Sequence, residues 1–230
     1  MKIGIIGAMA QEIKSLKEAM EDLKQWQRAN VVFYSGRISE QEVVVVESGI
    51  GKVLSSLTTS LLIQQYQVDL VINTGSAGGI GQGLAVGDLV LSEKLAYYDV
   101  DATGFGYAYG QVPGGMPLYY EADQDLIEKF SRAAAQADLP VKKGLIVTGD
   151  SFVCDPQKIQ EILAHFPQAL CCEMEGASIA QTAMQFGVPF LVIRAMSDTA
   201  DHSASQSFDE FIDEAGKKSA ELVLNFIAAL

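Results

Sequence analysis

Short apolar runs alternate with amphipathic helical patterns along the chain, and this alternation restricts its possible folds more than any other feature. The runs are rich in Val, Ile and Leu and lack helical spacing, so each predicts a strand. Their nearly continuous apolar character, especially at 31–35 and 42–47, indicates burial on both faces of a sheet. The predicted strands are residues 2–6, 31–35, 42–47, 70–74, 88–92, 144–148 and 190–193.

The segments between the strands carry apolar residues three and four positions apart, as amphipathic helices do. Residues 53–66, 123–137 and 173–186 are predicted helices of this kind, and a further helix follows the first strand. The stripe of that further helix is Ile13, Leu16, Met20 and Leu23; the stripe of 53–66 is Leu54, Leu57, Leu61 and Leu62.

Capping residues mark several helix ends. Asp155 is a suitable N-cap for a helix whose first residue is Pro156, and Gly187 is a suitable C-cap for the helix over 173–186. A capping box at 207–210 predicts the start of the last helix. The order of elements predicts an α/β fold with a mostly parallel or mixed central sheet, in one domain over 1–230. The longest irregular stretch, 102–118, is long enough to be a functional loop, either a lid or an interface.

The charge balance argues against two kinds of binding partner. The chain has 16 Lys and Arg residues and 29 Asp and Glu residues, a net charge of −13. We expect neither nucleic acid nor an anionic membrane as a partner, because both need clustered cations. No apolar run approaches the length of a membrane span, and the apolar start of the chain is interpreted as a buried strand rather than a secretory signal.

The cysteines indicate a reducing compartment. Cys154, Cys171 and Cys172 are odd in number, and two of them are adjacent, which is poor geometry for a disulfide. We therefore expect free thiols and a cytoplasmic location. With only His165 and His202 besides, and no metal-ligand spacing, we expect no metal site.

Polar residues and glycines gather just after the predicted strands, where ligands bind in α/β sheets. Taken singly, each of these residues has a structural explanation. Glu12 can interact with a helix dipole, Asp198 can cap a helix, and Met174 can belong to the core. Arg194 is less ordinary, because a buried guanidinium needs a partner. The positions after strands are Gly7-Ala8-Met9 with Glu12, Ser48 to Gly51, Gly75 to Gly79, Asp150 to Phe152, and Arg194, Ser197 and Asp198. Glu173 to Glu175 lies instead at the start of a predicted helix.

Several carboxylates at one sheet edge suit the cleavage of a glycosidic bond. One carboxyl group can protonate the leaving group while another handles water, and negative charge favours an oxocarbenium-like transition state. The residues alone indicate a hydrolase or transferase that acts on a polar small molecule, with a sugar derivative as one option.

Seven segments in one order span nearly the whole chain: MKIGIIGAM at 1–9 with Glu12, SGIGKV at 48–53, NTGSAGG at 73–79, FGYxYGQ at 105–111, EME at 173–175, RAMSD at 194–198 and SFDEF at 207–211. Together they resemble the 5′-methylthioadenosine/S-adenosylhomocysteine nucleosidases of the nucleoside phosphorylase superfamily. The resemblance implies a three-layer α/β domain with helices flanking a mixed, barrel-like sheet, and no cofactor. It also implies hydrolysis of both nucleosides to adenine and a thio-substituted ribose.

The resemblance also implies roles for single residues. Asp198 is similar to the general acid that protonates adenine N7, a role that needs a carboxyl pKa above the free value of about 3.9. Glu12 resembles the residue that activates or orients the water, and Arg194 and Ser76 resemble residues that hold this water. Residues that resemble substrate contacts are Met9, Ile50, Ala77, Gly78, Phe152, Val153, Glu173, Met174, Glu175, Ser197 and Phe208.

Among these contacts, Glu175 resembles the ligand of the ribose hydroxyls, Phe152 the residue that stacks on adenine, and Phe208 a wall of the 5′-alkylthio pocket. Phe105 and Pro113 resemble residues that close this pocket from a partner subunit. The resemblance thus implies a homodimer in which the loop at 102–118 completes the neighbouring site.

Three other functions stay open. A nucleoside phosphorylase of the same fold would need several cationic phosphate ligands, and only Arg194 of the four arginines lies in a candidate site motif. A non-catalytic nucleoside-binding protein would not need Glu12 and Asp198 together. An aminofutalosine hydrolase would share adenine and ribose and differ only at the 5′ substituent.

Overall fold

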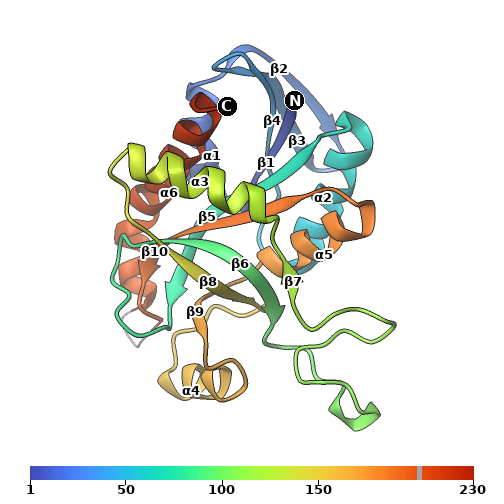
Figure 1. Cartoon of the computed structure of the whole chain (residues 1–230), viewed down its shortest axis with the longest axis vertical. Helices are drawn as coiled ribbons and strands as arrows, with labels where there is room; N and C mark the ends of the chain where they lie inside the picture. Colours follow the sequence, from blue (N-terminus) through green and yellow to red (C-terminus); the bar gives the residue numbers. More distant parts are fainter. Residues whose placement is uncertain (201–203) are drawn as a thin grey trace.

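The central sheet closes on itself in the computed structural model, which describes residues 1–200 and 204–230. Strand β10 pairs with both β6 and β5, so that five strands form a barrel: β5 (Leu70–Gly79), β9 (Ala169–Glu173), β8 (Val141–Thr148), β6 (Leu89–Tyr97) and β10 (Phe190–Asp198). From β5 the sheet continues through β1 (Lys2–Gly7), β4 (Gln41–Glu47), β3 (Val31–Ile38) and β2 (Glu21–Arg28), and β7 (Tyr120–Glu121) pairs with β6. The mixed, barrel-like sheet is confirmed (Figure 1).

Helices flank this sheet on several sides (Figure 1). The long α6 packs on β10 and β5 and contacts α1 and α3, where Phe130 stacks on Phe226 at 3.8 Å between ring centroids. Helices α2 and α5 pack against each other elsewhere on the sheet. Within the part of the chain that the structure describes, no helix has the length and apolarity needed to cross a membrane. The helices are α1 (Ala10–Glu18), α2 (Lys52–Tyr66), α3 (Gln124–Gln136), α4 (Pro156–His165), α5 (Gly176–Phe186) and α6 (Ala204–Ala228).

Strand β5 is the centre of the arrangement and brings distant residues to one edge. It runs parallel to β10, with Arg194 opposite Gly75 and Asp198 opposite Gly78. It is antiparallel to β9, with Gly78 opposite Cys172. The ends of β5, β9 and β10 therefore lie side by side, although 89 residues separate the end of β5 at Gly79 from the start of β9 at Ala169.

The structure corrects the expected ends of these strands. The glycine-rich segment at 75–79 was expected to follow its strand as a turn, but it is the second half of β5. Likewise β10 continues through Arg194 to Asp198, and residues 169–173 form β9, so α5 begins at Gly176. In each case the strand extends past the residues whose local sequence predicts a strand, because pairing with neighbouring strands satisfies the backbone hydrogen-bonding groups there.

The first helix is shorter than predicted and an unpredicted strand follows it. Helix α1 ends at Glu18, so Met20 and Leu23 do not belong to its stripe. Residues Glu21–Arg28 form β2, which is exposed along its whole length and pairs with β3. Strand β3 is partly exposed rather than buried on both faces, because this edge of the sheet carries no covering layer over β2.

Several predicted helix ends are confirmed. The carboxylate of Asp155 accepts the N–H of Gln157 at 2.9 Å ahead of Pro156, and Gly187 ends α5 with φ 66°. The last helix instead begins at Ala204, so Ser207 lies inside it and the predicted capping box at 207–210 is wrong as a helix start. His202 lies outside the described residues.

Helix α2 matches its predicted span, but its apolar stripe is only half buried. Leu62 is buried, whereas Val53 is 78% exposed and both Leu54 and Leu57 are exposed. The irregular stretch at 102–118 is confirmed apart from a short 3-10 helix, η1 (Thr103–Phe105), and it projects from the barrel (Figure 1).

Candidate active site

A cavity of about 450 Å³ lies where β1, β5, β9 and β10 end and α1 begins. Its wall also includes residues of the first turns of α6. The structure therefore gathers side chains from every segment that the sequence placed at the sheet edge. The predicted site residues that line the cavity are Met9, Glu12, Ile50, Ser76, Ala77, Gly78, Phe152, Val153, Glu173, Met174, Glu175, Ser197, Asp198 and Phe208.

Glu12 is held by donors from two parts of the chain. Its Oε2 accepts the backbone N–H groups of Ala8 and Met9 at 2.7 and 3.1 Å, which places the carboxylate at the N-terminus of α1. Its Oε1 accepts from the N–H and the hydroxyl of Ser76 at 2.9 and 3.0 Å. The approach to β5 is so close that a Cβ at Gly75 would lie 2.6 Å from this oxygen. Glu12 is thus a buried, rigid carboxylate that faces the cavity.

Asp198 is buried at the end of β10 and is also held on both oxygens. The hydroxyl of Ser197 donates to Oδ2 at 2.8 Å, and the N–H of Ala200 donates to Oδ1 at 2.8 Å. A Cβ at Gly78 would lie 2.9 Å from Oδ1, so glycine is needed at this position of β5. The carboxyl group therefore has one orientation in the cavity wall.

Two further glutamates and a buried arginine form an ionic cluster beside the cavity. Arg194 Nη2 donates to Glu173 Oε2 and, at 2.6 Å, to Asn73 Oδ1. Although burial lowers the pKa of the Arg194 guanidinium, Glu173, Glu175 and Glu12 raise it above its ordinary value. Burial, with the charge of Glu173, raises the pKa of Glu175 to about 8. The cluster therefore holds one permanent cation and a carboxyl group that titrates near neutral pH.

Arg194 is buried and contacts Glu173, and among the described residues it is not one of those that line the cavity. The expectation of a partner for a buried guanidinium is confirmed. Arg194 lies behind the carboxylates, and its part in holding the water stays a prediction.

Apolar and aromatic side chains form the rest of the wall. Phe152 and Phe208 meet edge to face, with ring centroids 5.6 Å apart and planes at 79°. Met9, Ile50 and Met174 add thioether and aliphatic surface. Such a wall suits a planar base and an alkylthio group, while the carboxyl groups supply hydrogen bonds at defined points.

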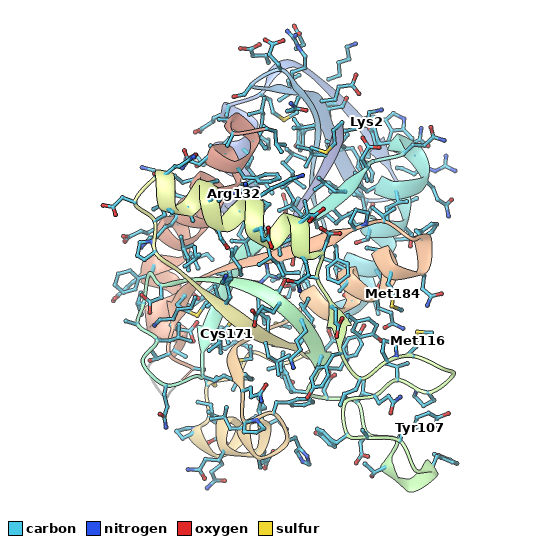
Figure 2. All side chains as sticks on the ribbon, viewed as in Figure 1. Lys2, Tyr107, Met116, Arg132, Cys171 and Met184 are labelled. Atoms are coloured by element: carbon cyan, nitrogen blue, oxygen red, sulfur yellow. The ribbon has the colours of Figure 1, made fainter. Side chains whose placement is uncertain are left out.

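Phe105 and Pro113 lie away from this cavity on the loop at 102–118, which also carries Tyr107 and Met116 (Figure 2). Phe105 is 88% exposed. Within one subunit the loop does not bring these side chains to the site, and the expectation that they serve a neighbouring site is not tested by a single chain.

The cavity also includes Ala8 and Ser151, which lie in segments that the sequence placed at the sheet edge, and Cys172 and Asp209, to which the sequence assigned no role. Asp209 lies within a recognised motif, so its position could have been found. Cys172 lies in β9, the strand that was not predicted, and burial raises the pKa of its thiol. Over residues 1–200 and 204–230, no group of three or more His, Cys, Asp or Glu side chains is placed to hold a metal ion.

The closed mixed sheet and the cavity at its strand ends define the class of protein. The sequence pattern of the phosphorylase superfamily matches residues 2–228, and the chain belongs to that superfamily. Within it, the 5′-methylthioadenosine/S-adenosylhomocysteine nucleosidase of Geobacillus thermodenitrificans is 48% identical over 231 residues, which cover 100% of this chain and 98% of the relative.

Two solved structures of such nucleosidases are similar to this chain in sequence and in fold. The Streptococcus pneumoniae nucleosidase with the transition-state inhibitor MT-ImmA is 49% identical, with a TM-score of 0.96 over 100% of this chain and 99% of that one. The Neisseria meningitidis nucleosidase with methylthio-immucillin-A is 45% identical, with a TM-score of 0.98 over 100% and 99%. The chain belongs to the 5′-methylthioadenosine/S-adenosylhomocysteine nucleosidase family.

Proposed function

We propose that this chain hydrolyses the N-glycosidic bond of 5′-methylthioadenosine and S-adenosylhomocysteine, releasing adenine and the thio-substituted ribose. Membership of the nucleosidase family supports this activity. The observation that carries it is one cavity with two rigidly held carboxyl groups, Glu12 from α1 and Asp198 from β10.

In this proposal Asp198 is the general acid. Adenine is a poor leaving group as an anion, so the proton of Asp198 passes to N7 as the bond between C1′ and N9 breaks and its electron pair stays on adenine. Water then forms the new bond to C1′, and its proton passes to Glu12. The Ser76 hydroxyl, which donates to Glu12 Oε1, helps to orient this water.

The sugar carries positive charge as the bond breaks, and the remaining groups suit that charge. Glu12 and Glu173 supply negative charge beside the cavity, and we assign Glu175 to the ribose 2′- and 3′-hydroxyls. Arg194 acts through these carboxylates, because it contacts Glu173 and lies 3.7 Å from Glu175.

The apolar wall accounts for the two ends of the substrate. Phe152 stacks on adenine and the Val153 backbone contacts its edge, with Ala77, Gly78 and Ser197 close by. Met174 lies under the ribosyl ring. Met9, Ile50 and Phe208 surround the 5′-alkylthio group.

Exposed apolar side chains support a proposal of self-association. Val53 and Leu57 on α2 and Phe105 on the projecting loop leave large apolar side chains exposed. Isolated exposed apolar residues are common, but such residues on one helix and a protruding loop mark interaction surfaces. We propose a homodimer in which Phe105 and Pro113 of one subunit close the 5′ end of the other's cavity. We also propose a cytoplasmic location, which the three free cysteines support.

Water is favoured over phosphate as the nucleophile. Among the described residues that line the cavity, none is a lysine or an arginine, whereas a phosphate dianion needs several cationic donors. The guanidinium of Arg194 is already engaged by Glu173 and Asn73.

The decisive experiment measures adenine release from methylthioadenosine, S-adenosylhomocysteine and aminofutalosine, each with and without phosphate. We expect turnover of the first two at a rate that phosphate does not change. Turnover that requires phosphate would identify a phosphorylase. Binding without adenine release would identify a non-catalytic nucleoside-binding protein, and turnover of aminofutalosine alone would identify the related hydrolase.

A further inference from the structure

Two buried glutamates at the start of α5 have unequal hydrogen-bonding partners. Glu173 Oε2 accepts the backbone N–H groups of Glu175 and Gly176 at 3.0 and 2.7 Å, and a hydrogen bond from Arg194. Glu175 Oε1 accepts the N–H of Gly51 at 2.9 Å. Helix N–H groups and a guanidinium all favour negative charge, and more of these donors meet Glu173 than Glu175.

Thr148, the last residue of β8, completes the partners of Glu173. Its hydroxyl donates to Glu173 Oε1 and accepts the N–H of Ala177 at 2.8 Å. Strands β8 and β9 pair with Thr148 opposite Glu173, so the contact follows from the sheet register. One hydroxyl thus joins the carboxylate to the first turn of α5.

Thr148 acts at a distance from any ligand. Its side chain is fully buried, and it is not among the described residues that line the cavity. A role in the reaction must therefore pass through Glu173.

We propose that Thr148 is a positioning residue that holds Glu173 as the anionic cap of α5 and so leaves Glu175 as the carboxyl group presented to the ribose. Without the hydroxyl, Glu173 Oε1 loses this donor and the N–H of Ala177 loses its acceptor. The Glu173 carboxylate, which already lines the cavity, is then held on Oε2 alone and can rotate about those contacts against Glu175. The inference rests on the proposed function at one point, the contact between Glu175 and the ribose hydroxyls.

The test compares two substitutions at this position with a control elsewhere. Thr148→Val removes the hydroxyl and keeps the shape of the side chain, whereas Thr148→Ser keeps the hydroxyl. Thr58→Val is the matched control, because Thr58 in α2 is also fully buried and its hydroxyl has no hydrogen-bond partner among the described residues. The ligands are adenine and an analogue of methylthioadenosine that keeps the ribose and resists hydrolysis.

We expect Thr148→Val to weaken binding of the analogue about tenfold or more while the Kd of adenine changes by about twofold at most. With methylthioadenosine as substrate, KM should rise by a larger factor than kcat falls. Thr148→Ser should restore both constants to within about threefold of the wild type, and Thr58→Val should leave them unchanged.

A Thr148→Val protein with the wild-type ratio of the two Kd values would overturn the inference. So would equal weakening of adenine and the analogue, which is the result of general disorder. If Thr148→Val does not fold, Thr148→Ala can be used instead. It removes the same hydrogen bonds without placing a methyl group where the hydroxyl was, and the ratio of the two Kd values is again the deciding measurement. Failure of the wild type to release adenine refutes the proposed function instead, because the Kd ratio does not depend on turnover.

Discussion

Replacing Glu12 by Gln should destabilise the fold as well as slow the reaction, and the structure allows the size of the first effect to be worked out. The carboxylate accepts four hydrogen bonds, two on each oxygen. A glutamine has one acceptor oxygen and one donor NH₂ group. The least costly orientation keeps the oxygen toward Ala8 and Met9 and turns the NH₂ toward Ser76.

In that orientation the NH₂ can donate to the Ser76 hydroxyl, but the Ser76 backbone N–H faces another donor and has no acceptor. Ser76 is partly buried, and an N–H that loses its acceptor there costs at most about 1–3 kcal/mol; loss of a charge at the α1 N-terminus adds about 0.5 kcal/mol. We expect a loss of about 1.5–3.5 kcal/mol, which for a chain of this length lowers Tm by about 3–14 °C.

Thermal unfolding at one fixed protein concentration measures this loss, with Glu18→Gln as the control because Glu18 is exposed on the same helix. Well below the Tm of the variant, kcat should fall by roughly 10²–10⁴ for the loss of the group that takes the proton from water. A Glu12→Gln protein with wild-type Tm would refute the hydrogen-bond reasoning. A folded variant with wild-type kcat would refute the assigned role.

Three other predictions test other parts of the site. Asp198→Asn should lower kcat by roughly 10²–10⁴ with little change in the Kd of a non-hydrolysable analogue, and an unchanged kcat would exclude Asp198 as the acid. Burial raises the pKa of Glu175 from 4.5 to about 8, so between these pH values the folded state keeps a proton that the unfolded chain loses. The contribution of this group to the free energy of unfolding therefore falls as the pH rises from 4.5 to 8. In urea unfolding, the free energy of unfolding of Glu175→Gln minus that of the wild type should be larger at pH 8 than at pH 5. A difference that does not change with pH would contradict this coupling between the pKa of Glu175 and stability. Phe105→Ala should raise KM, because this side chain is 88% exposed in one subunit and closes the other subunit's cavity in the proposed homodimer, and an unchanged KM in a protein shown to be dimeric would exclude a shared pocket.

The candidate site could be located from the sequence because its residues lie in short segments. Glu12, the 173–175 segment and the 194–198 segment follow apolar runs, and such positions meet at one edge of an α/β sheet. The structure places their side chains around one cavity, with Arg194 behind the wall. The separate partners of Glu173 and Glu175 could not be predicted, because they depend on Thr148, Gly51 and Arg194, which are distant in sequence.

The sequence by itself determined the alternation of strands and helices, the ends marked by Asp155 and Gly187, and the family that the motifs resemble. These features depend on local periodicity, capping and short motifs, which a single segment carries. It did not show β2, whose polar, exposed residues have no apolar period, or that 75–79 continue β5.

Only the tertiary structure decided that β10 pairs with β5 as well as β6 and thereby closes the barrel. Closure places Gly78 against Asp198 and Gly75 against Glu12, contacts that leave no room for a side chain on β5. The physical reason is that strand pairing and the environment of a buried charge arise from residues far apart in the chain. The same glycines that suggest a turn in the sequence are the positions at which β5 approaches the two carboxyl groups.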